Sequence, residues 1–263
     1  MIDWNSVWDL QMLVTDRARL NDGVFWDRMA KDDSSGRFTE ELTEFQLQCL
    51  SLQGNESVLE IGPGKGRLTR EIAKRSASLT VIDPSKSMLE ELAKSFEDEG
   101  LNDVEMINSK LEDTSLEELG RHDVVVASYS LFMMDMETQL TKLSDAAIDR
   151  VCIFVPANIR VPKEVQAMLK GTDADIQLPD HAILFNLLSD MGIKADVLIR
   201  SYKVSRNYAD LETALDEQMR FYNATDDKRE RMAEYVSSLL KTDGSGMVLE
   251  QERSTAMLRW HLP

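Results

Sequence analysis

A glycine-rich turn directly after an apolar strand constrains the fold of this chain more than any other feature. Residues 58–66 read Val-Leu-Glu-Ile-Gly-Pro-Gly-Lys-Gly, and a second apolar run, residues 79–82, is followed by Asp83. A strand that enters a tight glycine turn and then a helix, with a carboxylate at the tip of the next strand, is how a doubly wound α/β sheet holds a nucleoside. The two features therefore predict such a sheet, with a nucleoside-containing ligand at its edge.

The spacing of the glycines separates two classes of nucleoside cofactor. Gly62, Gly64 and Gly66 follow the pattern G-x-G-x-G. A dinucleotide-binding turn instead needs G-x-G-x-x-G, whose last glycine lets the helix pack close to the strand. Arg67 occupies that position here, and the spacing therefore disfavours a nicotinamide-dependent oxidoreductase.

Glu60 lies two residues before the first glycine, and the resulting acid-x-Gly-x-Gly-x-Gly pattern resembles the first motif of class I S-adenosylmethionine-dependent methyltransferases. The resemblance implies that S-adenosyl-L-methionine is the cofactor, that the glycine turn wraps its methionine part, and that Asp83 holds both ribose hydroxyls. The chain also resembles uncharacterised small-molecule methyltransferases of anaerobic microbes, in its N-terminal tryptophans and in the His-Asp-Val-Val run that begins at residue 122.

The resemblance covers about residues 56–155 and implies further cofactor contacts beyond the first two strands. In the family, the loop after the third strand lies beside the adenine, often with an acid that is replaced by Lys110 here. Leu111 is then expected to offer an apolar face to the ring, and the end of the fourth strand lies near the sulfonium. The implied cofactor-binding residues are Glu60, Gly62, Pro63, Gly64, Gly66, Asp83, Pro84, Ser109, Lys110, Leu111, Ala127 and Ser128.

Apolar runs and helical periodicity alternate regularly after residue 56. Strands are expected at 57–61, 79–82, 104–107, 122–127, 150–155, 195–199, 247–250 and 255–260. Helices are expected at 66–75, 85–99, 115–119, 137–147, 208–221 and 226–240. This alternation demands a parallel sheet with right-handed crossovers, and the last two strands are expected to form a hairpin. The predicted fold class is α/β, with a doubly wound, mostly parallel seven-stranded sheet, an antiparallel final strand and an N-terminal helical cap.

The expected domains are an N-terminal helical cap or lid over residues 1–55 and a Rossmann-like methyltransferase domain over residues 56–263. Within the second domain, the helices near 208–240 are expected to be an insertion before the closing strand. Three prolines bracket residues 158–178, whose structure and role the sequence leaves open.

Candidate acceptor-binding residues are aromatic side chains near the expected cofactor site. In small-molecule methyltransferases an N-terminal helical segment often shapes the acceptor pocket, and aromatic faces suit a sulfonium cation. The candidates are Trp4, Trp8, Trp26, Phe38 and Tyr129, with Phe25 in the same segment. The sequence shows no conspicuous nucleophile or acid–base pair, and the weak candidates for a catalytic residue are Tyr129, His181 and Glu40.

Composition disfavours several kinds of partner. The 47 acidic and 30 basic residues give a formal net charge of -17, which repels phosphate backbones and anionic membranes. No secretory signal and no membrane-spanning run is expected. Cys49 and Cys152 are expected to be buried free thiols in a cytoplasmic protein. The three histidines lack metal-ligand spacing, so no metal site is expected.

The leading hypothesis is a methyltransferase that acts on an unidentified small molecule. The end of the fourth strand reads Ala-Ser-Tyr-Ser and lacks the Asn-Pro-Pro-Tyr-like motif of enzymes that methylate planar amino groups of bases or glutamine. The alternatives are a protein or RNA methyltransferase and a cofactor-binding protein without turnover. The acceptor atom and the oligomeric state are left open, with a homodimer as one option.

Overall fold

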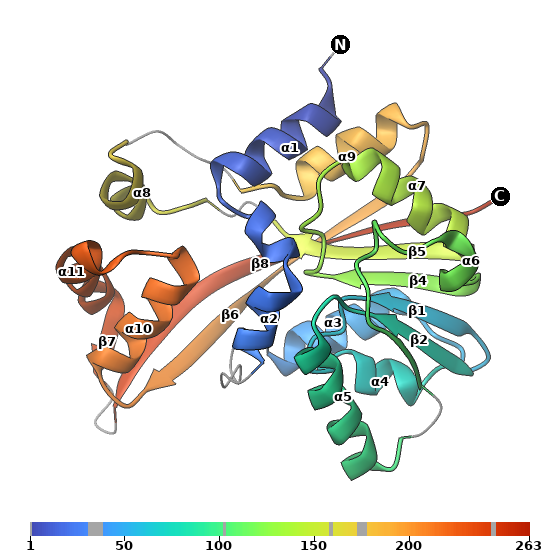
Figure 1. Ribbon diagram of the computed structural model, residues 1–263, viewed down its shortest axis with the longest axis horizontal. Coiled ribbons are helices and arrows are strands. Elements are labelled where there is room, and N and C mark those ends of the chain that lie inside the picture. Colours follow the sequence, from blue (N-terminus) through green and yellow to red (C-terminus); the bar gives the residue numbers. More distant parts are fainter. Residues whose placement is uncertain (1, 31–38, 102–103, 158–159, 173–177, 243–245) are drawn as a thin grey trace.

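The computed structural model describes residues 2–30, 39–101, 104–157, 160–172, 178–242 and 246–263. Its centre is one sheet in the order β3-β2-β1-β4-β5-β8-β6, with a short β7 paired to β8 (Figure 1). The strands are β1 (Ser57–Ile61), β2 (Ser78–Ile82), β3 (Val104–Ile107), β4 (His122–Ser128), β5 (Ala147–Pro156), β6 (Asp196–Tyr208), β7 (Leu240–Thr242) and β8 (Met247–His261).

Strands β1 to β5 run parallel, and β8 pairs antiparallel with both β5 and β6. The strand order reverses between β1 and β4, which is where a doubly wound sheet opens a crevice for a ligand. The predicted fold class is therefore confirmed, and the antiparallel closing strand lies inside the sheet between β5 and β6.

Helices cover both faces of the sheet (Figure 1). One face packs against α3 (Glu40–Leu50), α4 (Thr69–Ala73) and α5 (Lys86–Glu99), and the other against α1 (Trp4–Val14), α7 (Met136–Ala146) and α9 (His181–Asp190). The single turn α6 (Leu116–Leu119) carries a capping box from Ser115 and Glu118, which satisfies two backbone amides reciprocally. Helix α4 is shorter than the expected 66–75, because residues 62–68 are taken up by the glycine turn.

Helix α1 belongs to the hydrophobic core. Trp8 and Met12 are 2% and 1% exposed and pack in the same cluster as α7 and α9. The indole N–H of Trp8 donates to the carbonyl of Met133 over 3.0 Å, so the one polar atom of this side chain is also satisfied. Removing α1 would therefore uncover the apolar surfaces of α7 and α9.

The expected hairpin at residues 247–260 is wrong, because these residues form one continuous strand. β8 pairs with β6 without interruption from Asp196 opposite Arg259 to Tyr208 opposite Met247. Polar residues near the middle of β8, which resemble a turn in sequence, instead face cross-strand partners where the two strands leave the main sheet.

The far ends of β6 and β8 carry a third apolar cluster, here called the distal cluster. It is built from α8 (Lys163–Lys170), α10 (Leu211–Tyr222) and α11 (Arg229–Leu239), and its buried members include Met219, Met232 and Leu249. A short turn, η2 (Asp226–Lys228), joins α10 to α11. The expected helices near 208–240 are thus present, on a strand pair that is much longer than the expected 195–199 (Figure 1).

The described residues bear on what composition predicts for cysteines, membrane-spanning helices and metal sites. Cys49 and Cys152 are buried and free. No described helix has the length and apolar character needed to cross a membrane. Within the same residues, no three His, Cys, Asp or Glu side chains gather in a way that could hold a metal ion.

Candidate functional site

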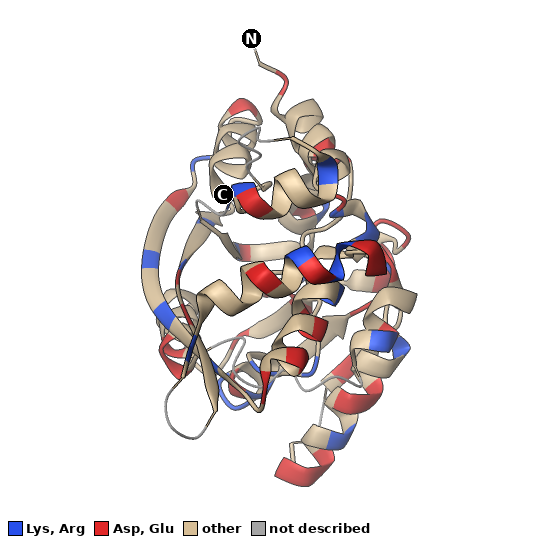
Figure 2. Cartoon of the chain, turned by 90° about the vertical axis from the view of Figure 1, so that its left-hand side faces the viewer, with Lys and Arg blue, Asp and Glu red and all other residues tan. Residues whose placement is uncertain are grey.

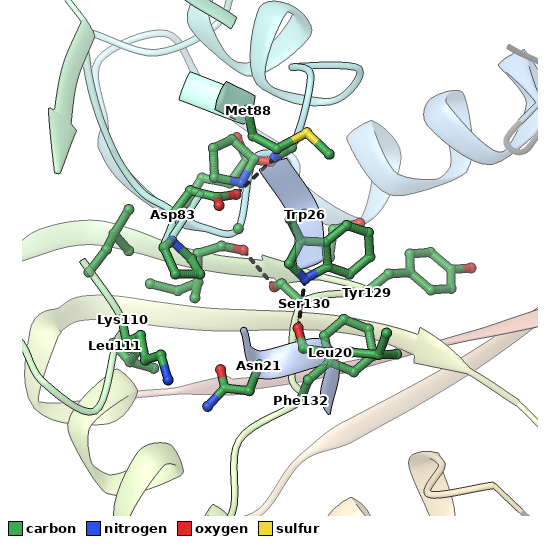
Figure 3. Close-up of a pocket in the computed structure, with 18 of the residues that line it drawn as sticks. Leu20, Asn21, Trp26, Asp83, Met88, Lys110, Leu111, Tyr129, Ser130 and Phe132 are labelled. Atoms are coloured by element: carbon green, nitrogen blue, oxygen red, sulfur yellow. Dashed lines mark hydrogen bonds between the residues drawn. The ribbon is translucent and has the colours of Figure 1, made fainter. Parts of the chain in front are cut away.

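A cavity of about 430 Å³ opens at the carboxyl ends of β1, β2 and β4. Its lining comes from the glycine turn after β1, from Asp83 after β2, from the loops after β3 and β4, and from an N-terminal segment that lies over them. Figure 3 shows side chains from all these segments converging on one space, with Asp83 on one side and Lys110 and Leu111 on another. The cavity therefore lies where the strand order of the sheet predicts a ligand.

The glycine turn is shaped by close packing behind it and open space in front of it. A Cβ on Gly62, where φ is +67°, would lie 2.4 Å from the Cβ of Ser130, and the hydroxyl of Ser130 donates to the carbonyl of Ile61 over 2.5 Å. Gly64, with φ of +55°, has no neighbouring atom within 4 Å of its would-be Cβ. The backbone at Gly64 is thus free to be approached closely by a ligand.

Gly66 has a different role from the other two glycines. Its Cβ would lie 2.3 Å from Cδ1 of Leu92, so this glycine lets the turn pack against α5. It does not line the cavity.

Asp83 is 5% exposed and lines the cavity. Its Oδ1 accepts from the backbone amide of Ser85 over 2.8 Å, and its Oδ2 accepts only a long bond of 3.4 Å from the amide of Gly64. Burial raises the pKa of Asp83 to about 6, against these two amides, which lower it. One carboxylate oxygen therefore retains capacity for a donor in the cavity.

Glu60 is a second buried carboxylate on the cavity wall. It is 2% exposed, and its Oε2 has no hydrogen-bond partner among the described residues. Burial raises the pKa of Glu60 to about 7, an effect that Thr69 and the Arg67 guanidinium oppose and Asp83 reinforces. This buried oxygen therefore has the capacity to accept a further hydrogen bond.

Arg67 ties the glycine turn to α3. Its guanidinium donates to the hydroxyl of Thr43 and to the side-chain carbonyl of Gln46, each over 2.7 Å. Gln46 in turn donates to the hydroxyl of Ser128 over 2.8 Å. The residue that breaks the dinucleotide pattern thus connects the turn to the end of β4.

An N-terminal segment covers part of the cavity. Leu20 and Asn21 of η1 (Ala18–Asn21), and Trp26 and Met29 of α2 (Gly23–Met29), line it. The indole of Trp26 donates to the carbonyl of Leu20 over 2.6 Å and lies 6.0 Å from the ring of Phe132 (Figure 3). Trp26 and Phe132 form an aromatic wall of the cavity.

Helix α2 is fastened to the start of α5. Asp27 accepts from the hydroxyl of Ser85 over 2.7 Å and from the amide of Ser87 over 2.9 Å. A Cβ on Gly23 would lie 2.3 Å from the carbonyl oxygen of Pro84. Helix α2 therefore rests directly on the residues that follow Asp83.

The loop after β3 is held from the opposite side of the cavity. Lys142 of α7 donates to the carbonyls of Leu111, Glu112 and Thr114 over 2.7, 3.2 and 2.9 Å. Leu111 is 3% exposed and lines the cavity together with Ser109 and Lys110. One partly buried ammonium thus fixes the loop that presents these three residues.

Tyr129 lines the cavity, but its hydroxyl is engaged elsewhere. The residue has φ of +58°, and its phenol bonds to the hydroxyl of Thr255 and, over 3.3 Å, to that of Tyr202. Burial raises the pKa of Tyr129 far above its ordinary value, with Tyr202 acting in the same direction. The phenol is therefore neutral at any physiological pH.

The structure brings together most of the residues that the sequence singled out for the cofactor. The expected residues that line the cavity are Trp26, Glu60, Gly62, Pro63, Gly64, Asp83, Pro84, Ser109, Lys110, Leu111, Ser128 and Tyr129. Ala127 is buried under the cavity in β4, and Gly66 packs on α5.

The remaining candidates lie elsewhere. Trp8 is in the core, Trp4 lies beside a shallow pocket with Ile2, and Glu40 is exposed in the first turn of α3. His181 begins α9, with its Nδ1 3.8 Å from Asp180. Phe38 lies outside the described residues. Trp4, Trp8, Glu40 and His181 do not line the cavity.

Several lining residues were not expected from the sequence. They are Leu20, Asn21, Met29, Ile61, Lys65, Arg67, Leu68, Arg70, Ile82, Met88, Phe132 and Met133. These residues reach the cavity through tertiary contacts, such as the approach of α2 to Pro84, which the sequence does not encode locally.

Residues 58–170 match the family model described as "Methyltransferase domain". An uncharacterised protein from Haemophilus influenzae is 28% identical over 151 residues, which are 57% of this chain and 56% of that protein. A protein-L-isoaspartate O-methyltransferase from Dictyoglomus thermophilum is 38% identical over 95 residues, covering 34% of this chain and 42% of that protein. The chain thus matches about half the length of these curated relatives.

Two solved structures share the fold. A putative methyltransferase from Bacillus halodurans has a TM-score of 0.59 at 12% identity, covering 84% of this chain and 98% of that one. The N-methyltransferase NodS from Bradyrhizobium japonicum, solved with S-adenosyl-L-homocysteine, has a TM-score of 0.54 at 11% identity, covering 92% and 99%. At these identities the likeness concerns the fold, while the family model identifies the domain by sequence.

Proposed function

We propose that this chain, which carries a class I S-adenosylmethionine-dependent methyltransferase domain, transfers a methyl group from that cofactor to a small-molecule acceptor. The observation that carries the proposal is the position of Asp83. It is a buried carboxylate at the end of β2, on the wall of a cavity that also contains the open face of the glycine turn. A carboxylate so placed suits the two hydroxyls of a ribose.

The cavity residues fit an adenosyl group with an amino-acid tail. Asp83 would accept from the ribose, and Ile82, Met88 and Leu111 would form the apolar slot for the adenine. The backbone of Gly64, where a Cβ would have no neighbour within 4 Å, would lie along the methionine part of the cofactor. The unpartnered Oε2 of Glu60 is an acceptor near the same turn, to which a donor of the ligand could be joined directly or through water.

When bound, the cofactor supplies a methyl group that is already activated by its sulfonium. The chain's own residues then have to align the acceptor and exclude water. Trp26 and Phe132 provide an apolar wall for this, and Ser128 and Ser130 provide hydroxyls near the end of β4. Tyr129 is not proposed as a base, because its phenol is buried and hydrogen-bonded to Thr255.

A small acceptor is favoured by the cover over the cavity and by the charge of the chain. Residues of η1 and α2 close one side of the cavity with aromatic and apolar groups. The net charge is -17, and on the face shown in Figure 2 the coloured basic residues are interspersed with acidic ones over the helices. Neither feature suits the binding of RNA, because proteins bind a phosphate backbone through clustered positive charge.

A protein acceptor is the second candidate, because one curated relative is a methyltransferase for protein L-isoaspartate. The match covers only 34% of this chain. Methylation of a peptide mixture, with no activity on small molecules, would favour this candidate. A non-catalytic role would be favoured by cofactor binding with every acceptor class inactive.

We propose a narrower lid than the expected cap over residues 1–55. Residues 18–29 line or cover the cavity, whereas α1 and α3 pack into the two cores. We also propose a cytoplasmic location, since the buried thiols of Cys49 and Cys152 suit a reducing compartment. Cell fractionation tests the location independently of activity.

Calorimetric titration with S-adenosyl-L-homocysteine, with NADH titrated in parallel, tests the cofactor class. Binding of the first alone, with one site per chain, is the expected result. Binding of NADH alone would overturn the proposal in favour of redox chemistry. A chain that binds S-adenosyl-L-homocysteine would then be incubated with methyl-labelled cofactor and pooled small amines, phenols, thiols and carboxylates, where label transfer identifies the acceptor atom.

A further inference from the structure

Strand β6 forms one edge of the described sheet, and the first part of this edge is apolar and uncovered. Val197, Leu198 and Ile199 are 38%, 50% and 45% exposed. Successive strand residues point to opposite faces, so neither face is covered by helices at this place. An exposed apolar edge whose outer backbone groups face away from its neighbour is a template for pairing with another strand.

We propose that this edge pairs with the same edge of a second copy of the chain, in an antiparallel register centred on Leu198. Such a pairing forms about a two-fold axis perpendicular to the sheet, and the interface is isologous. Val197 then lies opposite Ile199 of the second copy, and Leu198 lies opposite Leu198. Asp196 lies opposite Arg200 of the second copy, so both ends of the pair join opposite charges.

The sequence of the strand selects this register among the symmetric ones. Centring the axis one residue earlier would place Lys194 opposite Arg200 and Asp196 opposite Leu198. Centring it one residue later would place Leu198 opposite Arg200. Of these three registers, only the one centred on Leu198 pairs apolar with apolar and acid with base throughout residues 196–200.

The existing contacts of the two charged residues leave room for this pairing. Asp196 accepts from Arg259 over 3.1 Å while its side chain remains 68% exposed. The guanidinium of Arg200 lies 5.6 Å from the ring centroid of Phe45. Asp196, Leu198 and Arg200 alternate along the strand and therefore share one face, on which each Asp196 would lie between Arg259 of its own chain and Arg200 of the other.

The expected dimer is weak and dependent on concentration and salt. A pair of short strands buries less than the roughly 1,200–2,000 Å² of stable interfaces. Each copy also carries a net charge of -17, whose long-range repulsion is reduced at physiological ionic strength. The association is thus expected to strengthen when salt is raised from low to physiological concentration.

Analytical ultracentrifugation of the full chain from about 1 µM to about 1 mM covers the range in which such an interface dissociates. The mass is expected to rise from that of the 29.9 kDa monomer toward that of a dimer. Asp196→Arg and Arg200→Asp each place like charges opposite each other and are expected to weaken association at least about tenfold. The double variant restores opposite charges in the same register and is expected to recover it.

Leu198→Lys places two ammonium groups at the axis and is expected to abolish association. Ile148→Lys is its matched control, because Ile148 is 48% exposed on β5, a strand that does not pair with β6, and it is expected to dimerise like the unaltered chain. Circular dichroism and thermal melting show whether each variant is folded. A folded chain that remains monomeric at the highest concentration overturns the proposal. So does a dimer that Leu198→Lys leaves intact, or a charge swap that does not restore pairing in folded variants.

Discussion

At the scale of single residues, the cavity is defined by two carboxylates that the fold keeps out of water. Asp83 and Glu60 are 5% and 2% exposed, and burial raises the pKa of each. Burying an ionised carboxylate without enough donors is unfavourable. The chain therefore holds these groups at a cost to stability, which is typical of a binding site that a ligand completes.

Asp83→Ala is expected to weaken binding of S-adenosyl-L-homocysteine by about 2–3 kcal/mol, because hydrogen bonds from the ribose to a charged acceptor are lost. Calorimetric titration measures the change. Asp98→Ala, at an exposed site on α5, is the control and should leave the affinity unaltered. If Asp83→Ala bound normally, the ribose would have to be held by another group.

The affinity for S-adenosyl-L-homocysteine is expected to rise with pH through about 6, the pKa to which burial raises Asp83. Only the ionised carboxylate accepts from both hydroxyls, so the affinity at pH 5 should be about tenfold below that at pH 7. Asp83→Asn should remove this dependence, whereas Glu60→Gln should retain it. A pH profile that is the same in Asp83→Asn and in the unaltered chain would count against this assignment.

The same shift predicts a pH dependence of stability without ligand. The folded chain keeps the proton of Asp83 up to about pH 6, whereas an ordinary aspartate releases it near 3.8. The stabilising contribution of this proton is therefore fully present below pH 3.8 and is lost as the pH rises through about 6. Urea unfolding of Asp83→Asn should show a shallower fall in stability across that window.

At the scale of elements, the two N-terminal helices differ: α2 lies at the cavity, and α1 belongs to the hydrophobic core. Helix α2 reaches the cavity through Trp26, and it is held by Asp27 on α5. Helix α1 buries Trp8 against α7 and α9. Both helices carry tryptophan, and the burial of these side chains distinguishes what the sequence could not.

Gly23→Ala is expected to loosen α2, although alanine normally favours a helix over glycine. The added Cβ would lie 2.3 Å from the carbonyl oxygen of Pro84, so the helix has to move away from Asp83. Faster hydrogen exchange in residues 23–30 and weaker binding of S-adenosyl-L-homocysteine are the expected readouts. Val24→Ala, at a side chain that is 61% exposed, should change neither. Unchanged exchange in Gly23→Ala would contradict the close docking.

Trp8→Ala is expected to lower the free energy of unfolding by about 3–5 kcal/mol, as for large side chains removed from a core. Trp4→Ala should cost less, because Trp4 is only partly buried at the margin of the same cluster. Denaturant titration of both variants measures the difference. Equal losses of unfolding free energy would mean that Trp4, at the edge of the cluster, holds α1 as strongly as the buried Trp8 does.

At the scale of the whole molecule, two cores flank the sheet and the distal cluster forms a third. Met232 is fully buried there, among residues of α8, α10 and the ends of β6 and β8. Strands β6 and β8 connect this cluster to the main sheet, and polar contacts such as Arg19 to the carbonyl of Phe221 and Asn223 to Asp16 add to this link. The sequence places these helices correctly but does not reveal what they pack on.

Met232→Ala is expected to increase hydrogen exchange in α8, α10 and α11, while α3 and α5 retain their protection. The cavity left by a buried methionine destabilises its own cluster by about 2–5 kcal/mol, and the distal cluster shares no buried residue with the other two. Met12→Ala is the converse control in the main core. Uniform loss of protection across the sheet would show that all three clusters unfold as one unit.

Sequence alone predicted the parts of this molecule whose signals are local. Strand ends, the glycine turn, Asp83 and the Ser85 cap of α5 depend on neighbours in the chain. The continuity of β8 and the lining by Leu20, Asn21 and Met88 depend on elements that meet from distant parts of the chain. Trp8 and His181 were misleading for the same reason, since a residue type cannot say on which side of a helix the ligand lies.

The interior position of β8 has a consequence for how the chain is synthesised. β8 follows every other described strand in sequence, yet it lies between β5 and β6 and pairs with both. While the ribosome makes residues 157–246, one side of β5 has no partner, although Val151, Cys152, Ile153 and Phe154 are fully buried in the finished sheet. An apolar strand left unpaired during translation is prone to aggregation. The nascent chain is therefore expected to need protection at β5 until residues 247–261 emerge.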